Sequence, residues 1–417
     1  MPTNNSVHAG WAKGEDTFGR MIPVGLLLAM LFTTLAFGAV EAWSVAVFGT
    51  LIAVLFLLWG VKCFVEKQLT LVVPTIAWPL VALIVLGLLQ SISRTDESGK
   101  RFAISMDIEA TRLLLELLVV LLAALLLFAN FFTNEAQLSR LQNFLIFFGF
   151  ALAIFGILQK LTWNGKYYWL IEPSSPPMAP FGSFVNHNHF AGYLEMIVPI
   201  PVALILVRAI TGELSLFYGF AAVIMSVAIF FSLSRGGMIS LVAGLVFVIA
   251  FGIKGWARMR EDRRWASIVL PRLGAVLLII GTIGAGVWWI GGDALIDRAE
   301  HTDLTGEAPD NAGKETFLKS RGWIWRDTVT MIHANWVTGV GLGAFETAYS
   351  LYSQHDGSMI VSQAHNDYLQ VAADGGVAGG IIATWFLIIL FRDFTRALSS
   401  RSGMGFGMAL GCCGGIV

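Results

Sequence analysis

Long apolar runs, each close to the length that crosses a lipid bilayer, recur through this 417-residue chain. A helix needs about 20 apolar residues to cross roughly 30 Å of hydrocarbon. Backbone groups in lipid are satisfied only inside helices or closed barrels, so the runs predict an all-α polytopic membrane protein. Ten complete runs lie near residues 21–40, 43–61, 71–90, 113–132, 143–160, 190–208, 216–233, 237–253, 267–290 and 371–391, and an unfinished one begins near 403.

The composition agrees with a membrane protein. Hydrophobic residues make up 56% of the chain and charged residues 13%, with a mean hydropathy of +0.72. A soluble domain carries about 25% charged residues. The formal net charge of −1 gives no basic surface for nucleic acid. Cys63, Cys412 and Cys413 lack the spacing of metal ligands. The first apolar run exceeds the ~7–15 residues of a signal-peptide core, so we predict an uncleaved membrane anchor.

The distribution of Lys and Arg in the short loops predicts the orientation. With a cytoplasmic N-terminus, fourteen of these residues fall on the inner side and seven on the outer side. We therefore expect three parts: a nine-span bundle at 1–290, an external loop with amphipathic helices at 291–369, and C-terminal spans at 370–417. Within the loop, helices are expected near Lys314–Ala334 and Ala344–Tyr352.

Three polar clusters interrupt the apolar sequence at span ends, and the predicted topology places all of them outside. They are Asn186-His187-Asn188-His189, Ser234-Arg235-Gly236-Gly237 and His365-Asn366-Asp367-Tyr368. Polar groups at a bilayer edge are costly to keep dry, so converging ones indicate a functional site.

His365 can stay neutral near pH 7 and accept a proton from a hydroxyl, or it can cap the helix that follows. We expect its neighbour Asn366 to contact the substrate. Arg235 stands beside two glycines that leave room for a guanidinium to bind a phosphate or carboxylate. The alternative for Arg235 is a snorkelling anchor to the headgroups.

Further candidates come from the external segments. Arg321 and Arg326 belong to the predicted outer helix and either complete an anion clamp or are ordinary surface charges. Asn186, His187 and His189 either bind a polar head or sugar or cap the sixth span. A metal site there is disfavoured, because histidines at i and i+2 do not face each other and no carboxylate or cysteine completes a ligand set.

Three carboxylates lie inside spans, namely Glu116, Glu195 and Asp374. At that depth they should be paired or hydrated. They either orient the arginines and bind substrate hydroxyls, which is the role expected of Glu195, or form a proton path. The segment Gly339–Gly343 follows no predicted strand, so it is interpreted as a turn and not as a nucleotide loop.

Taken in order, the motifs resemble the O-antigen ligase/polymerase superfamily. They are Asn-His-Asn-His-Phe-Ala-Gly-Tyr at 186–193, Leu-Ser-Arg-Gly-Gly at 233–237, Arg-Gly-Trp-Ile-Trp at 321–325, Gly-Val-Gly-Leu-Gly at 339–343 and His-Asn-Asp-Tyr-Leu at 365–369. The resemblance implies a bacterial inner-membrane protein with a GT-C-like helical bundle and a large periplasmic loop. Members have about twelve spans against the ten complete runs here, so we expect a chain cut short at its C-terminal end.

The resemblance also implies a reaction. A glycan would pass from undecaprenyl diphosphate to a hydroxyl of lipid A-core (ligase) or of another glycan repeat (polymerase), and related enzymes modify protein. His365 matches the essential loop histidine, and Arg235 and Arg321 match arginines that hold the diphosphate. We expect inversion at the sugar without a metal or other cofactor, since no Asp-x-Asp cluster marks the site.

Two rival functions remain. A transporter or flippase for lipid-linked or anionic solutes would use Glu116, Glu195 and Asp374 as a proton relay. It predicts inverted repeats and helices broken by Gly or Pro in matching halves, and neither is seen in the sequence. A purely structural assembly protein is the third option. The acceptor, the sugar and the oligomeric state are not encoded in any motif.

Overall fold

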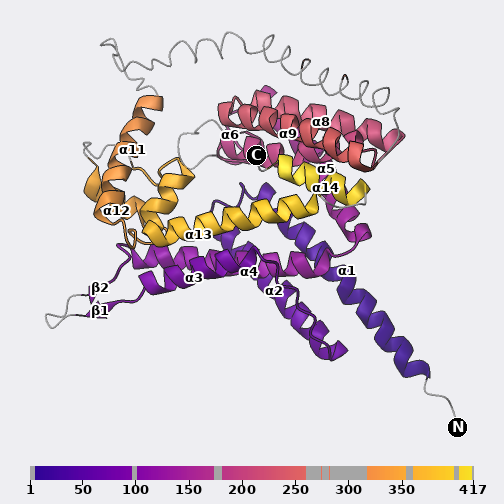
Figure 1. Ribbon diagram of the computed structural model, residues 1–417, viewed down its shortest axis with the longest axis horizontal. Coiled ribbons are helices and arrows are strands. Elements are labelled where there is room, and N and C mark those ends of the chain that lie inside the picture. The colour runs from indigo at the N-terminus through magenta and orange to yellow at the C-terminus, as the bar shows by residue number, and fades with distance from the viewer. Residues whose placement is uncertain are drawn as a thin grey trace. The chain divides into compact units, whose positions relative to one another are not determined.

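The computed structural model describes residues 5–95, 101–172, 181–259, 317–353, 360–398 and 403–415, together with Gly274 and Gly281. Within this part, eight helices are long and apolar enough to cross a membrane, judged by length and composition (Figure 1). The prediction of an all-α polytopic membrane protein is therefore confirmed. The run predicted at 267–290 lies outside the described residues, apart from those two glycines.

The chain divides into two compact units. Unit 1 comprises residues 1–71, 127–292 and 392–417, and unit 2 comprises 72–126 and 293–391. The helices of unit 1 are α1 (Asn5–Leu35), α2 (Ala42–Glu66), α5 (Glu135–Leu161), α6 (His187–Ile197), α7 (Pro199–Leu206), α8 (Glu213–Phe231), α9 (Arg235–Met259) and α14 (Gly403–Gly414). The three-part division along the sequence stays a prediction.

Unit 2 contains α3 (Ala77–Gln90), α11 (Phe317–Ala334), α12 (Phe345–Tyr352) and a short antiparallel ribbon of β1 (Arg94–Thr95) and β2 (Arg101–Phe102). Two helices begin in unit 2 and end in unit 1: α4 (Ile108–Phe131) and α13 (Asp367–Ala397).

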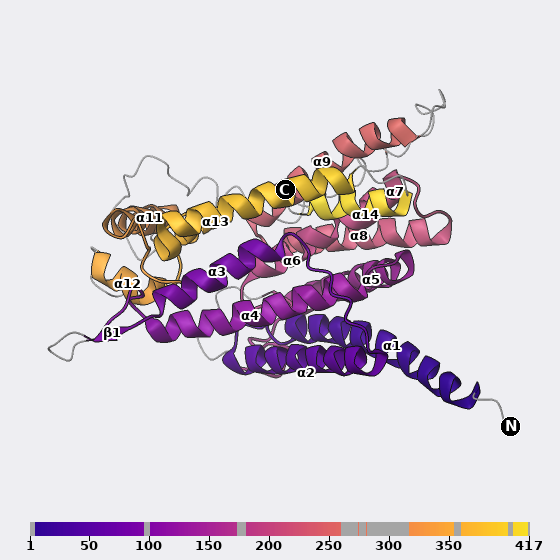
Figure 2. The same ribbon diagram turned by 60° about the horizontal axis from the view of Figure 1, so that its bottom comes forward.

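The core of unit 1 forms where α5 to α9 pack with α14. Phe190, Leu194 and Met225 are fully buried there. Glycines bring α14 close to its neighbours: a Cβ added at Gly411 would lie 2.5 Å from the Ile200 Cα. Close approach through small residues is how helices associate in lipid. Separately, α1 and α2 form a hairpin whose turn ends at Glu41, between the apolar runs predicted at 21–40 and 43–61 (Figure 2).

The α6–α7 pair is a single candidate span of 20 residues, His187–Leu206. Val198 between the two helices keeps helical angles. The interruption follows from Pro199 and Pro201, because proline has no N–H to donate to the preceding turn.

Helices α11 and α12 of unit 2 pack around their own small core. Ile324 and Met331 of α11 and Phe345 and Tyr349 of α12 are buried there. The two helices lie where the sequence predicted them. Inside this core the Tyr349 hydroxyl donates to Asp327 Oδ2 at 3.0 Å. Burial, together with the Asp327 carboxylate, raises the pKa of Tyr349 to about 12, so the phenol keeps the proton that it donates.

The span α13 is broken at Gly376, which adopts φ 56° and ψ −148°. The loop Trp336–Gly343 fills the break: Val340 N–H donates to Ala373 O at 2.9 Å, Gly341 N–H to Asp374 O at 3.1 Å, and Val377 N–H to Trp336 O at 2.9 Å. The sequence shows no sign of a span broken by glycine, and that expectation is wrong for α13. The freed backbone groups bind the protein itself, whereas a transporter uses such groups to coordinate its ions.

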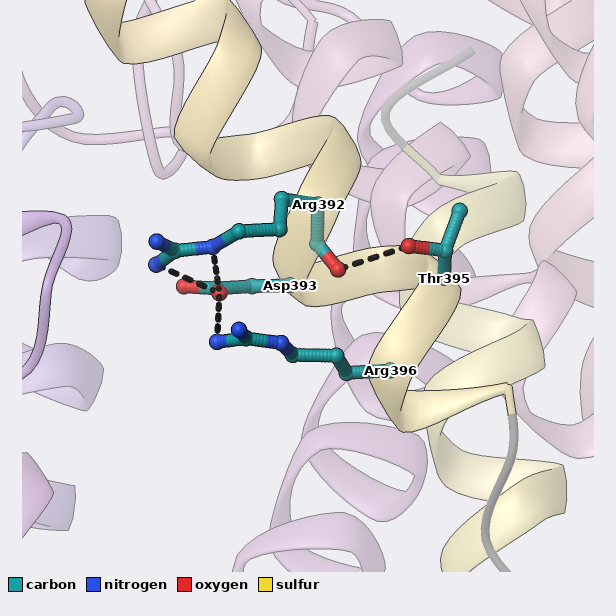
Figure 3. A network of polar contacts seen from close by, with 4 residues as sticks. All are labelled: Arg392, Asp393, Thr395 and Arg396. Carbon is teal, nitrogen blue, oxygen red and sulfur yellow. Dashed lines mark hydrogen bonds and ion pairs between the residues drawn. The ribbon is translucent and has the colours of Figure 1, made fainter.

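The other end of α13 carries charge. Asp393 Oδ1 accepts from Arg392 Nη2 at 3.0 Å and lies 3.8 Å from Arg396 Nη1, and Thr395 donates to the Arg392 carbonyl at 2.7 Å (Figure 3). These side chains are partly exposed, so the ion pairs add little stability. Arg392 and Arg396 belong to the basic set that predicts the cytoplasmic side.

Candidate functional site

In unit 1, Arg235 is the first residue of α9, and Ser234 caps that helix. The Ser234 Oγ accepts from Gly237 N–H at 3.2 Å, which is the N-cap to N3 bond of a serine cap. The connection from α8 is therefore 232–234, slightly earlier than the predicted 234–236, because Gly236 and Gly237 continue the helix. The Arg235 side chain is exposed at this end of α9.

The start of α6 is joined to the start of α9. Ser234 Oγ donates to Asn188 Oδ1 at 2.8 Å. Asn186 caps α6, since its Oδ1 accepts from Asn188 N–H at 2.8 Å, so the capping alternative applies to this asparagine. His187 is the first residue of α6, and His189 is exposed two positions later.

The two glycines after Arg235 differ in how closely they approach neighbouring residues. A Cβ at Gly237 would lie 2.6 Å from the Ala191 Cβ, so this glycine lets α9 approach α6. A Cβ at Gly236 would meet nothing within 4 Å. Glu195 lies on the same side: its Oε2 is 3.4 Å from the Cβ position of Gly237, and this buried oxygen has no hydrogen-bond partner among the described residues.

This end of unit 1 has the electrostatics of an anion site. Helix N-termini carry a partial positive charge, and two of them, α6 and α9, meet through the Asn188–Ser234 bond. The exposed Arg235 adds a full charge and a fork of donors suited to phosphate. The Glu195 carboxylate beside Gly237 is suited to accept from sugar hydroxyls or to orient a cation.

In unit 2, His365 lies in the loop before α13. It is exposed and has a left-handed backbone conformation, φ 51°, whereas Ala364 before it is 0% exposed. Asn366 caps α13, because its Oδ1 accepts from Tyr368 N–H at 3.1 Å and Leu369 N–H at 3.3 Å. The helix-capping role that the sequence left open for His365 is thus filled by Asn366.

Both candidate arginines of the outer helix are on α11. Arg326 is exposed, and its neighbour Asp327 is buried against Tyr349. Arg321 lies nearer the start of α11, and its side chain falls outside the described part of the structure. Because Arg235 belongs to unit 1 and His365 to unit 2, their convergence stays a prediction.

Sequence reasoning missed the side chains that hold the His365 loop. Trp325 Nε1 donates to Ala364 O at 3.0 Å, and Gln370 Oε1 accepts from Ala364 N–H at 2.8 Å. Gln370 Nε2 donates to Asp374 Oδ2 at 3.1 Å, which identifies a partner for that buried carboxylate. One signal in the sequence could have indicated this network, since Gln90 is a polar residue at the end of an apolar run. In the structure its Nε2 donates to the Asp374 carbonyl at 2.9 Å.

The Gly339–Gly343 segment is a turn, as the sequence indicated. Gly339 N–H donates to Asn335 O, Leu342 N–H to Gln90 Oε1, and Gly343 N–H to Asp374 Oδ2. With Val340 and Gly341 bound to α13, the N–H groups of all five residues already have protein acceptors. The segment therefore has no backbone donors left to cradle a phosphate.

Comparison with known families bears on these sites. Residues 220–384 match the family model described as O-Antigen ligase. This segment is similar to an O-antigen ligase domain. This finding confirms the resemblance predicted from the motifs and indicates glycan transfer of the O-antigen ligase/polymerase type.

The matched segment includes Arg235, Arg321 and His365, whereas the Asn186–His189 cluster precedes it. No curated protein matches the chain. Among the described residues, no group of three or more His, Cys, Asp or Glu side chains is arranged to hold a metal ion.

Proposed function

We propose that this chain is an inner-membrane glycosyltransferase of bacterial surface polysaccharide assembly. It moves a glycan from undecaprenyl diphosphate to a hydroxyl of lipid A-core or of another glycan repeat on the periplasmic face. The observation that carries the proposal is His365: an exposed imidazole on a left-handed residue, fixed between a buried alanine and a capped helix, inside the segment that matches the O-antigen ligase family.

Strain at a fixed, exposed side chain supports a chemical role for His365. A non-glycine residue in the left-handed region costs free energy, about 1–3 kcal/mol at such sites, and persists only where the surroundings hold it. Asn366 already caps α13, so stabilising the helix does not require the imidazole. Placing a proton acceptor outward from a rigid loop is the arrangement that general-base catalysis needs.

In the proposed reaction, the acceptor hydroxyl transfers its proton to neutral His365 as its oxygen bonds to the anomeric carbon. The bond from that carbon to the diphosphate oxygen breaks, and its electron pair leaves with the diphosphate. Arg235 and Arg321 stabilise the growing negative charge. Attack from the face opposite the leaving group inverts the anomeric centre in one displacement. Because the two guanidiniums neutralise the leaving diphosphate, the scheme requires no divalent metal.

The electropositive end of unit 1 supports this assignment for Arg235, because a diphosphate at the bilayer edge needs fixed cations and N–H donors. Asn186, His187, His189, Asn366, Arg326 and Glu195 are proposed to contact the glycan or the headgroup. The transporter alternative is weaker, because the backbone groups freed at the glycine break of α13 are bound by the protein itself.

The test is to replace His365 with alanine and to use His333→Ala as the matched control. His333 is exposed near the end of α11. Loss of a general base lowers the rate about 10²–10⁴-fold. We therefore expect His365→Ala to abolish glycan transfer in a deletion strain, while donor binding and the amount of folded protein persist and His333→Ala behaves as wild type. Normal transfer by His365→Ala would refute the proposed base.

Arg235 gives a second readout in the same assay. Arg235→Ala should weaken binding of the lipid-linked donor as well as transfer, and Arg235→Lys should restore little because an ammonium lacks the planar fork. Transfer that persists in EDTA agrees with a metal-free mechanism, whereas dependence on added magnesium contradicts it. Accumulated polymer beside bare core in the deletion strain would identify a ligase, and accumulated single repeats a polymerase.

A further inference from the structure

The backbone of Ala364, the residue before His365, is held at both its N–H and its carbonyl by side chains of other segments. Ala364 is 0% exposed. Its carbonyl, which belongs to the peptide bond joining it to His365, accepts from Trp325 Nε1 at 3.0 Å. Its N–H donates to Gln370 Oε1 at 2.8 Å. A buried residue whose N–H and C=O are both bonded has little freedom to rotate about its own backbone bonds, and its carbonyl orients the backbone of the next residue.

The amide of Gln370 is itself oriented. Its Nε2 donates to Asp374 Oδ2 at 3.1 Å, so its Oε1 must face Ala364. Asp374 is 7% exposed, and its Oδ2 also accepts from Gly343 N–H at 3.3 Å. The Asp374 carbonyl accepts from Gln90 Nε2 at 2.9 Å, which ties the network to α3. A buried chain of this kind is rigid when its members are bonded.

Helix α11, which carries Trp325, is also held in place by buried contacts. Trp325 follows Ile324, which belongs to the core shared with α12. Two residues later, Asp327 is buried and accepts from the Tyr349 hydroxyl. The indole is 37% exposed, so it is not a core residue, yet its N–H points to the Ala364 carbonyl.

We infer that Trp325 and Gln370 are positioning residues. Together they hold the carbonyl and the N–H of Ala364, an arrangement called here the clamp, and thereby fix the direction of the His365 imidazole. The inference rests on the proposed role of His365 as the proton acceptor. Neither residue touches the reacting atoms. They act by keeping a strained backbone in the one conformation from which the imidazole can reach a hydroxyl, and a displacement of about 1 Å in such a group lowers a rate by ~100-fold.

The test uses the full chain in membranes of a strain that lacks it, with the lipid-linked glycan of those membranes as the probe. Trp325→Phe keeps an aromatic ring but removes the donor, and Gln370→Leu keeps bulk but removes both bonds. The matched control is Trp336→Phe, because that indole is 61% exposed and outside the clamp. We expect kcat to fall about 10–100-fold in the first two variants, with KM for the lipid-linked glycan unchanged.

A rescue experiment separates positioning from loss of structure. Gln370→Glu alone places two carboxylates 3.1 Å apart and should lower kcat. Adding Asp374→Asn restores a donor opposite the new carboxylate, which still accepts from Ala364 N–H. Because Gly343 N–H loses its acceptor in this variant, the double variant should recover part of the rate. A rate that falls further in the double variant would count against the clamp.

A chemical readout does not depend on the reaction. Diethyl pyrocarbonate modifies exposed imidazoles, and mass spectrometry follows the modification of the peptide that carries His365. We expect the modification rate to differ from wild type in Trp325→Phe and Gln370→Leu, and to be unchanged in Trp336→Phe. Wild-type kcat and wild-type modification rates in both variants would overturn the inference, as would equal losses of kcat and of folded protein.

These outcomes separate the two proposals. If His365→Ala transfers glycan normally, the proposed base is wrong, while altered modification of His365 in the clamp variants still supports the positioning. If His365→Ala is inactive and the clamp variants behave as wild type in both readouts, only the positioning is wrong.

Discussion

The turn before Arg235 and the loop before Asn366 have similar backbones but are held by different means. Each has a non-glycine residue in the left-handed region just before a helix, Leu233 with φ 59° and His365 with φ 51°. At the first turn the bonds are mostly local: Leu233 N–H donates to Phe230 O at 2.9 Å, and Ser234 N–H to Ser232 Oγ at 3.3 Å.

The His365 loop depends on distant partners. Trp325 is 39 positions from Ala364, and Gln90 is 284 positions from Asp374. A turn with neighbouring partners forms as soon as its helices form, whereas the loop needs four segments of unit 2 in place. The backbone position of Arg235, the proposed cation, therefore depends mostly on neighbouring residues. The backbone position of His365, the proposed base, depends on tertiary packing.

The largest expected effect on this comparison comes from Gly376→Ala. A side chain at φ 56° and ψ −148° is strained by about 1–3 kcal/mol, and its Cβ would lie 2.6 Å from Gly339 N. We expect a strongly lowered melting temperature of the purified protein in detergent and loss of glycan transfer. Gly380→Ala, on the same helix with nothing within 4 Å of the new Cβ, is the control and should be neutral or stabilising. Equal behaviour of the two variants would mean that the break in α13 is not needed.

An intermediate effect is expected from replacing buried glutamines, one in each unit. Gln90→Leu removes bonds to Thr338 O, Asp374 O and Leu342 N–H, and unsatisfied buried groups cost about 1–3 kcal/mol. Gln142, 1% exposed in unit 1, donates once to Tyr218, and its Oε1 has no partner among the described residues. Gln142→Leu should therefore cost little. Similar losses of unfolding free energy in denaturant titrations of the two variants would remove the distinction between the units.

The smallest effect is expected from Asp107→Asn. The hydrogen bond between Thr347 and Asp107 joins segments distant in sequence, but it is exposed to solvent. Asp107 Oδ1 accepts from Ala110 N–H at 3.0 Å and Oδ2 from Thr347 Oγ1 at 2.7 Å. The bond from Ala110 N–H, followed by that from Thr347, lowers the pKa of Asp107 below its ordinary value of 3.8. The stability from this carboxylate is thus present above pH 3.8 and lost as the pH falls through the lowered pKa.

Because solvent screens this carboxylate, Asp107→Asn should lower the unfolding free energy by less than about 1 kcal/mol at neutral pH. Melting curves of wild type and variant should converge in acid, as the pH falls through the lowered pKa of Asp107. A gap that widens as the pH falls would reverse the assigned direction of the pKa shift.

Much of the secondary structure could be predicted from local sequence. The hairpin before α2, the helices α11 and α12, and the Gly339–Gly343 turn lie where apolar periodicity, glycine and capping residues indicated. The break at Gly376 could not, because α13 reads as an apolar run. Its cause is the close approach of Gly339, 37 positions earlier in the numbering, and no local pattern encodes that distance.

The sequence alone determined that the chain is a helical membrane protein and which polar residues stand at its span ends. Length, hydropathy and motif order are local properties, and the cost of exposing a backbone to lipid turns them directly into structure. Tertiary structure decided how those residues are held. Where Trp325 donates and which amide binds Asp374 depend on pairing polar groups across distant segments, and a buried group takes the partner that packing brings to it.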